Sequence, residues 1–115
     1  MSPGKRGDRV APPGEPGRWE LRFGNSDAGK GWEELCRQAP GNTLKAWEAI
    51  RSEPQPFPQT DRQHRLRGRT LATVNGLDQW QYEVTAGGRI WYLVEPAKMI
   101  VWIVFAGTGH PKATD

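Results

Sequence analysis

Two histidines, one glutamate and several arginines in the second half of the chain supply the groups that metal-free cleavage of RNA requires. In that reaction a ribose 2′-hydroxyl attacks the adjacent phosphate. A base takes the hydroxyl proton, cations stabilise the phosphorane, and an acid protonates the departing 5′-oxygen. Guanidinium groups suit the phosphate because they donate two parallel hydrogen bonds to it. The residues that supply these groups are His64, Arg65, Arg67, Glu83, Arg89 and His110.

The candidate base is Glu83 or His64, and the candidate acid is His110, since an unperturbed imidazole has a pKa of about 6.5. Structural roles compete with these catalytic ones. Glu83 could pair with Arg67 or Arg89 across a sheet, which is a surface ion pair worth less than about 1 kcal/mol. His64 could be an ordinary histidine at a strand edge, and His110 a solvated side chain. The residue types alone leave these alternatives open.

The basic residues are unevenly distributed, although the formal net charge is only +3. Arg62, Arg65, Arg67 and Arg69 fall within eight residues that include no acid. Such a run predicts the start of an anion-binding surface, while a solvated charged face is the commoner outcome. The candidate phosphate- and RNA-binding residues are therefore Arg65, Arg67, Arg69 and Lys112.

Composition limits the other classes of function. The single cysteine, Cys36, excludes a disulfide framework and a cysteine-based zinc site, so we expect no metal and no cofactor. No run of about 18 apolar residues is present, and residues 1–18 lack the apolar stretch of a signal peptide. We therefore expect a cytoplasmic protein that does not associate with membranes.

The elements that must position these side chains begin after a Gly- and Pro-rich basic tail, residues 1–18, which has too little apolar surface to pack. Alternation of apolar and polar residues predicts a strand over residues 19–23. A helix follows, with Ser26 or Asp27 as its N-cap, and ends just before Pro40. Its apolar face consists of Trp32, Leu35 and Cys36. Cys36 is therefore expected in the core.

A second helix is predicted with Asn42 as its cap, and the proline run that starts at Pro54 ends it. Leu44, Trp47 and Ile50 line its apolar face, while Glu48 and Arg51 lie off that face. Three or four antiparallel strands are predicted next, from segments over residues 64–69, 79–85, 89–95 and 99–106, with Gly87 and Gly88 as a two-residue hairpin connection.

This order predicts an α+β fold, in which an N-terminal αα-hairpin packs on one face of a small antiparallel β-sheet. Residues 19–112 form its single domain, and residues 113–115 a short C-terminal end. Among the six tryptophans, Trp32, Trp47 and Trp80 are expected in the core, whereas strand alternation leaves the faces of Trp91 and Trp102 undecided.

Strand alternation also groups the candidate site residues. Leu66 is expected to point inward, with Arg65 and Arg67 outward, and Glu83 and Arg89 lie opposite the apolar residues of their own strands. If every inward set faces the helices, the open sheet face carries Arg65, Arg67, Gln81, Glu83 and Arg89.

Three segments together resemble the RelE/ParE-like toxins of type II toxin–antitoxin systems. They are HRLRG (residues 64–68), WQYEVT (residues 80–85) and GRIWY (residues 88–92), followed by an apolar strand and His110. The resemblance covers roughly residues 19–112 and leaves the N-terminal tail without a counterpart. It implies a small sheet with two helices in front and a cognate antitoxin protein as inhibitor.

In the RelE- and YoeB-like branches, the resemblance further implies an endoribonuclease that cuts mRNA on the ribosome, in contact with rRNA. It implies that Arg89 contacts the scissile phosphate and that His110 is catalytic. This chain carries His64 where those members carry a base glutamate, so His64 and Glu83 both stay candidate bases. It also carries Pro111 where that branch has a tyrosine.

The fold alone does not settle the activity. ParE-like relatives inhibit DNA gyrase and do not cleave RNA, so a gyrase inhibitor is the alternative function. A third possibility is a non-catalytic module that binds only an antitoxin. The sequence does not constrain the oligomeric state.

Overall fold

The structure is a computed structural model that describes residues 4–10 and 17–108. It confirms the α+β fold, with both helices ahead of all strands but one. Within the described residues, no helix is long and apolar enough to cross a membrane. The elements are β1 (Glu20–Phe23), α1 (Ser26–Gln38), α2 (Pro40–Ser52), β2 (Gln63–Arg65), β3 (Thr73–Val74), β4 (Leu77–Glu83), β5 (Arg89–Glu95), the 3₁₀ turn η1 (Pro96–Lys98) and β6 (Ile100–Gly107).

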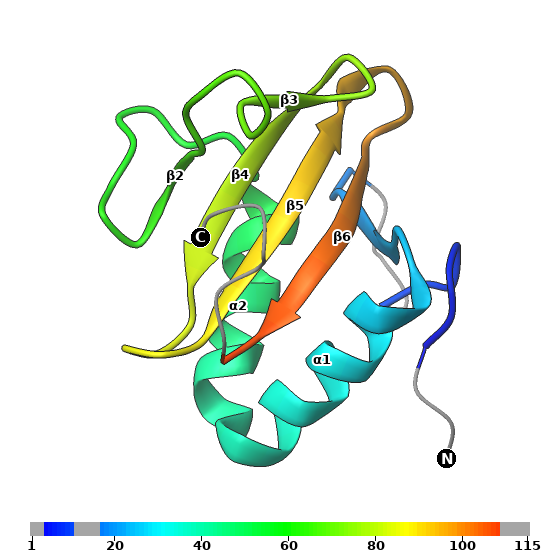
Figure 1. Cartoon of the computed structure of the whole chain (residues 1–115), viewed down its shortest axis with the longest axis vertical. Coiled ribbons are helices and arrows are strands. Elements are labelled where there is room, and N and C mark those ends of the chain that lie inside the picture. The colour runs from blue at the N-terminus through cyan, green and yellow to red at the C-terminus, as the bar shows by residue number, and fades with distance from the viewer. Residues whose placement is uncertain (1–3, 11–16, 109–115) are drawn as a thin grey trace.

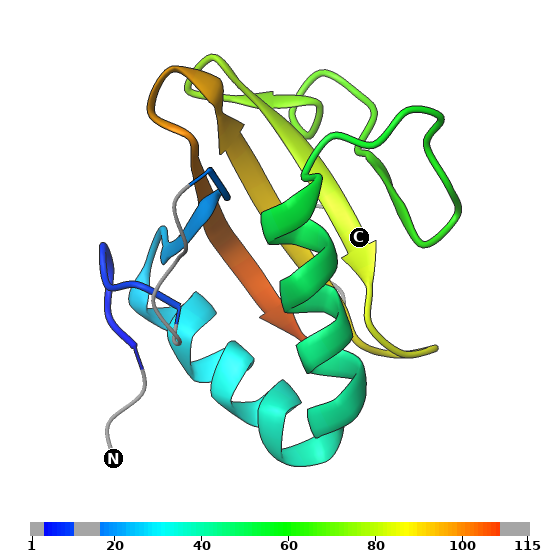
Figure 2. The same ribbon diagram turned by 180° about the vertical axis from the view of Figure 1, so that it is seen from behind.

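The strands form one sheet in the order β1-β6-β5-β4-β2, with β3 paired to β4. The described strands pair antiparallel except for β1 and β6, which are parallel. The prediction of an antiparallel sheet misses this pair, because β1 and β6 lie at opposite ends of the domain sequence. Both helices cover one face of the sheet, which lies in front of them in Figure 1 and behind them in Figure 2.

The N-cap of helix α1 lies one residue before the first of its predicted caps. Asn25 is the N-cap, and its side chain accepts a 2.7 Å hydrogen bond from the N–H of Ala28. Ser26 and Asp27, which were the predicted caps, therefore lie in the first turn. Cys36 is exposed, so its predicted place in the core is wrong. The buried residues of the helix are Ala28, Gly29, Trp32 and Leu35, so the buried face includes the small residues of the first turns in place of Cys36.

Helix α2 begins at Pro40, and its N-cap is Ala39, three residues before the predicted cap Asn42. Proline fits the first turn because it lacks an N–H that would have no helical acceptor there. The helix ends at Ser52, before Pro54, as the sequence predicts.

The buried face of α2 is rotated from the predicted one. Leu44 is 59% exposed, whereas Thr43 is buried and donates its hydroxyl to the carbonyl of Leu35 at 3.1 Å. Arg51, predicted to lie off the apolar face, is only 4% exposed and stacks over the ring of Trp47 at 4.2 Å. The Thr43 hydroxyl has a hydrogen-bond acceptor and the Arg51 guanidinium stacks on an aromatic ring, so both are buried at low free-energy cost. A prediction based only on the positions of apolar residues misses them.

The core lies between the helices and one face of the sheet. Trp32, Trp47 and Trp80 are buried there, as predicted. The strands contribute alternate residues, so the intervening ones face away from the helices. The sheet residues that belong to this core are Leu21, Phe23, Trp80, Tyr82, Ile90, Tyr92, Val94, Val101, Ile103 and Ala106.

A β-bulge in β6 changes which of its apolar residues face the helices. The register to β5 shifts between Trp91 and Tyr92, which pair with Phe105 and Ile103 respectively, so Val104 is the extra residue. Ile103 and Ala106 therefore both face the helices although they are three residues apart.

The segment between β2 and β4 differs most from its prediction. β2 covers residues 63–65, so only residues 64 and 65 of the strand predicted over 64–69 are in a strand, and the unpredicted β3 forms a hairpin with β4. Asn75 and Gly76 connect this hairpin with positive φ angles of 54° and 79°. An Asn-Gly pair is the strongest short hairpin signal, so the sequence does contain the information.

Residues 4–10 cover the outer edge of β1, although the sequence predicts an unpacked tail. The N–H groups of Gly7 and Val10 donate to the carbonyls of Phe23 and Leu21 at 2.7 and 2.8 Å, and Phe23 N–H donates to the backbone carbonyl of Asp8 at 2.9 Å. Val10 is 2% exposed and belongs to the core. The outer edge of β1 is thus hydrogen-bonded within the chain.

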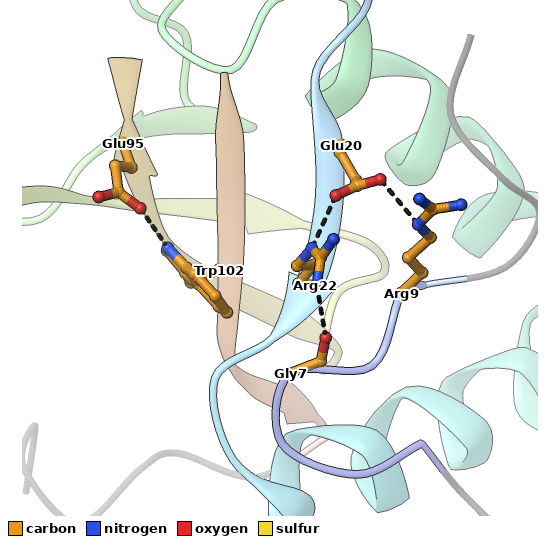
Figure 3. A network of polar contacts seen from close by, with 6 residues as sticks. All are labelled: Gly7, Arg9, Glu20, Arg22, Glu95 and Trp102. Atoms are coloured by element: carbon orange, nitrogen blue, oxygen red, sulfur yellow. Dashed lines mark hydrogen bonds and ion pairs between the residues drawn. The ribbon is translucent and has the colours of Figure 1, made fainter. Parts of the chain in front are cut away.

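Side chains reinforce this edge (Figure 3). Glu20 pairs with Arg9 at 2.8 Å and with Arg22 at 2.6 Å. Arg22 also donates to the carbonyl of Gly7 at 3.2 Å. Beside it, the indole N–H of Trp102 donates to Glu95 at 3.0 Å.

Candidate functional site

The sheet face opposite the helices carries a row of four side chains on neighbouring strands. Phe105 pairs in register with Trp91, Trp91 with Gln81, and Gln81 with His64. Directly paired residues share a sheet face, so these four lie side by side across β6, β5, β4 and β2. We call them the transverse row.

Contacts within the transverse row fix its centre. The rings of Trp91 and Phe105 meet edge to face with centroids 6.1 Å apart. The indole N–H of Trp91 donates to Oε1 of Gln81 at 2.8 Å. Trp91 is 4% exposed, whereas Phe105, Gln81 and His64 are partly exposed. The row therefore has a fixed indole in the middle and accessible groups on both sides.

Glu83 and Arg89 form the next pair along β4 and β5, on the same face. The backbone N–H of Glu83 donates to the carbonyl of Arg62 at 2.7 Å, on the β2 side. The backbone of Glu83 therefore makes no ladder hydrogen bond to the backbone of Arg89. Pairs of this non-hydrogen-bonded type bring their side chains closest together. Arg62 also donates its guanidinium to the Glu83 carbonyl at 2.9 Å, which anchors this end of β4.

His64 lies diagonally from Glu83, since its direct partner Gln81 is two residues earlier on β4. Diagonal neighbours in an antiparallel pair are about 7–8 Å apart at their Cα atoms. The Nδ1 atom of His64 lies 3.0 Å from the carbonyl of Arg65. A carbonyl oxygen can only accept, so Nδ1 carries the proton and Nε2 of the neutral ring has a free lone pair.

Arg65 does not lie on the open face, so its predicted position is wrong. It pairs in register with Trp80, on the helix side, and its guanidinium contacts Asp78 at 3.1 Å and the carbonyl of Ala72 at 2.9 Å. The alternation is inverted because Gln63, not Leu66, is the buried inward residue of β2.

The buried Gln63 has partners for its side-chain amide. Its Nε2 donates to the Tyr92 hydroxyl and to the carbonyl of Glu53, each at 3.0 Å. A glutamine with these partners is buried without an unmet donor, which a pattern of apolar residues does not anticipate.

The other predicted site residues divide into two groups. Arg67 and Arg69 follow β2 and are exposed, so they are available to an anion. His110 and Lys112 lie outside the described residues, so the structure gives no position for them. Of the predicted catalytic set, the structure brings together His64, Glu83 and Arg89.

Trp91 and Phe105 are the site residues that the sequence does not assign. The parity of β5 could have placed Trp91, because it is two residues from Arg89 and therefore on its face. The sheet face of Phe105 could be predicted only with knowledge of the bulge in β6, and the sequence pattern does not indicate that bulge. Within residues 4–10 and 17–108, no three His, Cys, Asp or Glu side chains gather into a group that could hold a metal ion.

No protein-family model matches the chain, and no curated protein matches it significantly. Function must therefore be inferred from this sheet face and from the sequence itself.

Proposed function

We propose that the chain is the toxin of a type II toxin–antitoxin system and a metal-independent endoribonuclease that cleaves mRNA. The observation that supports the cleavage chemistry best is the juxtaposition of His64, Glu83 and Arg89 on the open sheet face. An imidazole with a free Nε2, a carboxylate and a guanidinium are the groups that attack by a 2′-hydroxyl requires.

His64 is the proposed general base. Its Nε2 takes the proton of the 2′-hydroxyl while that oxygen bonds to phosphorus. His64 and Arg89 are two strand spacings apart across the sheet and offset by two residues along it, roughly 12 Å between their Cα atoms, which leaves room for a ribose and its phosphate between their side chains. Arg89 donates to the non-bridging phosphate oxygens, where negative charge grows in the phosphorane.

Glu83 is proposed as a positioning residue that orients the guanidinium of Arg89. The bond from phosphorus to the 5′-oxygen then breaks, and that oxygen takes a proton from an acid. The products are a 2′,3′-cyclic phosphate and a 5′-hydroxyl. His110 stays the candidate acid on sequence grounds alone.

The choice of mRNA and of partners rests on the sequence resemblance to RelE- and YoeB-like toxins. The proposed partners are a cognate antitoxin protein and the ribosome with its rRNA. Translated mRNA as substrate requires a cytoplasmic protein. The exposed Arg67 and Arg69 extend the cationic surface beyond the transverse row, which suits a nucleic acid.

The test is induction of the protein without an antitoxin in a bacterial host, followed by mapping of new mRNA 5′ ends within minutes. The variants are Arg89→Gln, His64→Gln and His110→Gln. Arg37→Gln is the matched control, because Arg37 is an exposed arginine of α1. We expect new ends within translated regions for the wild type and the control, and about 10²- to 10⁴-fold fewer for the three variants.

Growth arrest with DNA breaks and no new mRNA ends would contradict the nuclease and favour the gyrase-inhibitor alternative. Absence of both effects would favour the non-catalytic, antitoxin-binding module. New ends that persist in Arg89→Gln would contradict the site as assigned.

A further inference from the structure

A groove of about 510 Å³ lies along the outer side of β2 and adjoins the transverse row through His64. This volume is within the range of pockets that hold small organic ligands. The groove combines charged, polar and apolar walls. The lining residues that matter here are Thr60, Asp61, His64, Leu66, Arg67 and Leu71.

The wall formed by residues 59–61 is held in place by hydrogen bonds to the edge of β2. Gln59 accepts from the N–H of Arg65, and Thr60 accepts through its hydroxyl from the N–H of Gln63, both at 3.0 Å. Thr60 N–H donates back to the Gln63 carbonyl at 3.0 Å. The edge of β2 is therefore already satisfied at these positions, and the groove is not a site for an added strand.

Three charged side chains line the groove: Arg65, Asp61 and Arg67. Arg65 is paired with Asp78 at 3.1 Å, whereas Asp61 and Arg67 do not pair with each other. Within the described part of the chain, neither Asp61 nor Arg67 has a side-chain hydrogen bond or an ion pair, and both residues are exposed. The neighbouring Arg62 is directed to the Glu83 carbonyl. Asp61 can thus accept two hydrogen bonds, and Arg67 can donate two.

A ligand that matches both groups must present paired donors on one edge and paired acceptors on another, with flat apolar faces for Leu66 and Leu71. Guanine does so. Its N1–H and N2–H₂ are donors that suit a carboxylate, and its O6 and N7 are acceptors that suit a guanidinium. Adenine lacks the paired donors, and cytosine offers only a single amino donor.

We propose that this groove binds the guanine base of the nucleotide beside the cleaved phosphate, with Asp61 on its N1–H and N2–H₂ edge and Arg67 on its O6 and N7 edge. The assignment rests on the RNA-cleaving function proposed above, because His64 both lines the groove and belongs to the transverse row. The groove then selects where cleavage occurs.

The test measures binding of 3′-GMP, 3′-AMP, 3′-CMP and 3′-UMP to the full chain by isothermal titration calorimetry. The variants are Asp61→Asn and Arg67→Gln. Asp27→Asn is the matched control, since Asp27 is an exposed aspartate in the first turn of α1. Circular dichroism checks that each variant is folded.

We expect the wild type and the control to bind 3′-GMP about 10- to 100-fold more tightly than the other nucleotides, as bidentate base contacts allow. Asp61→Asn is expected to lose that preference while weak nucleotide binding persists. Equal affinity for all four nucleotides, a preference for 3′-CMP, or an unchanged preference in Asp61→Asn would overturn the proposal.

Mapping of mRNA ends separates this inference from the proposed function. New ends without a guanosine preference in binding would overturn the guanine groove and leave the nuclease intact. A guanosine preference that depends on Asp61, without any new ends, would support the groove and contradict the nuclease.

Discussion

Glu83 and Arg89 are register partners at the end of β4 and the start of β5, on the sheet face that the helices leave open. Both residues are half-buried at the sheet surface, where a cross-strand pair of opposite charges contributes less than about 1 kcal/mol to folding. Removing either charge should therefore change activity much more than stability. This difference allows catalytic and structural roles on this face to be separated by mutation.

His64 and Glu83 can be distinguished as bases by one pair of variants. If His64 is the base, His64→Gln should slow cleavage by about 10²- to 10⁴-fold, whereas Glu83→Gln, which removes only an orienting group, should slow it less. The measurement is the initial cleavage rate of a translated mRNA in a reconstituted translation reaction. The opposite order of effects would make Glu83 the base.

The buried hydroxyl of Tyr92 should be important for stability. Tyr92 is 0% exposed; its hydroxyl donates to the carbonyl of Pro54 at 2.7 Å and accepts from Gln63 at 3.0 Å. Tyr92→Phe leaves both partners without that bond, so we expect the free energy of unfolding to fall by about 1–3 kcal/mol. Urea denaturation at pH 7 measures it, and a neutral effect would contradict the buried network.

The Tyr92 hydroxyl should also make the free energy of unfolding depend on pH in a defined direction. Burial raises the pKa of the Tyr92 phenol far above its ordinary value of 10.0. Above pH 10 the unfolded chain releases this proton and the folded chain keeps it, so stability falls as pH rises. Relative to Tyr92→Phe, the wild type should lose about 1.4 kcal/mol by pH 11. A constant difference between the two proteins from pH 8 to pH 11 would contradict the shift.

The β4–β5 hairpin shows how far sequence reasoning can reach. The Gly-rich connection correctly predicts a hairpin and a shared face for Glu83 and Arg89. The loop is nevertheless longer than the predicted Gly87–Gly88, because Val84 N–H donates to the Gly88 carbonyl and Gly88 N–H to the Thr85 hydroxyl. The side-chain hydrogen bond sets the loop length, and apolar periodicity does not encode it.

β2 marks the limit of the same reasoning. Alternation assumes that polar residues face outward, yet Gln63 and Arg65 face the helix side because Tyr92 and Asp78 supply their partners. Those partners are more than ten residues away in sequence, so no local pattern contains them. Helix and strand types follow from local periodicity, whereas the composition of the open face depends on long-range polar pairs.

The N-terminal segment should protect the edge of β1. Removal of residues 1–10 eliminates the bond from Phe23 N–H to Asp8 and leaves an unpaired edge. We expect roughly tenfold faster amide exchange at Phe23 and a concentration-dependent rise in mass by light scattering. Glu20→Gln, which removes only the ion pairs of Glu20 with Arg9 and Arg22 drawn in Figure 3, is the control that should stay monodisperse if the full chain is. Unchanged exchange at Phe23 in the truncated chain would contradict a protective role.

Two glycines in the helices should respond in opposite directions to alanine. A Cβ atom at Gly31 would overlap the carbonyl oxygen of Ala106, so α1 and β6 approach each other closely there, whereas a Cβ at Gly41 would meet no atom within 4 Å. Gly31→Ala should therefore destabilise the fold by about 1–3 kcal/mol, and Gly41→Ala should stabilise it by up to about 1 kcal/mol. Urea denaturation of both variants gives the comparison.

Because Ala106 follows Phe105, the shift forced by Gly31→Ala should also disturb the transverse row, and the Trp91 indole N–H resonance should move in this variant but not in Gly41→Ala. A neutral Gly31→Ala with an unchanged indole resonance would contradict the close packing of α1 on β6.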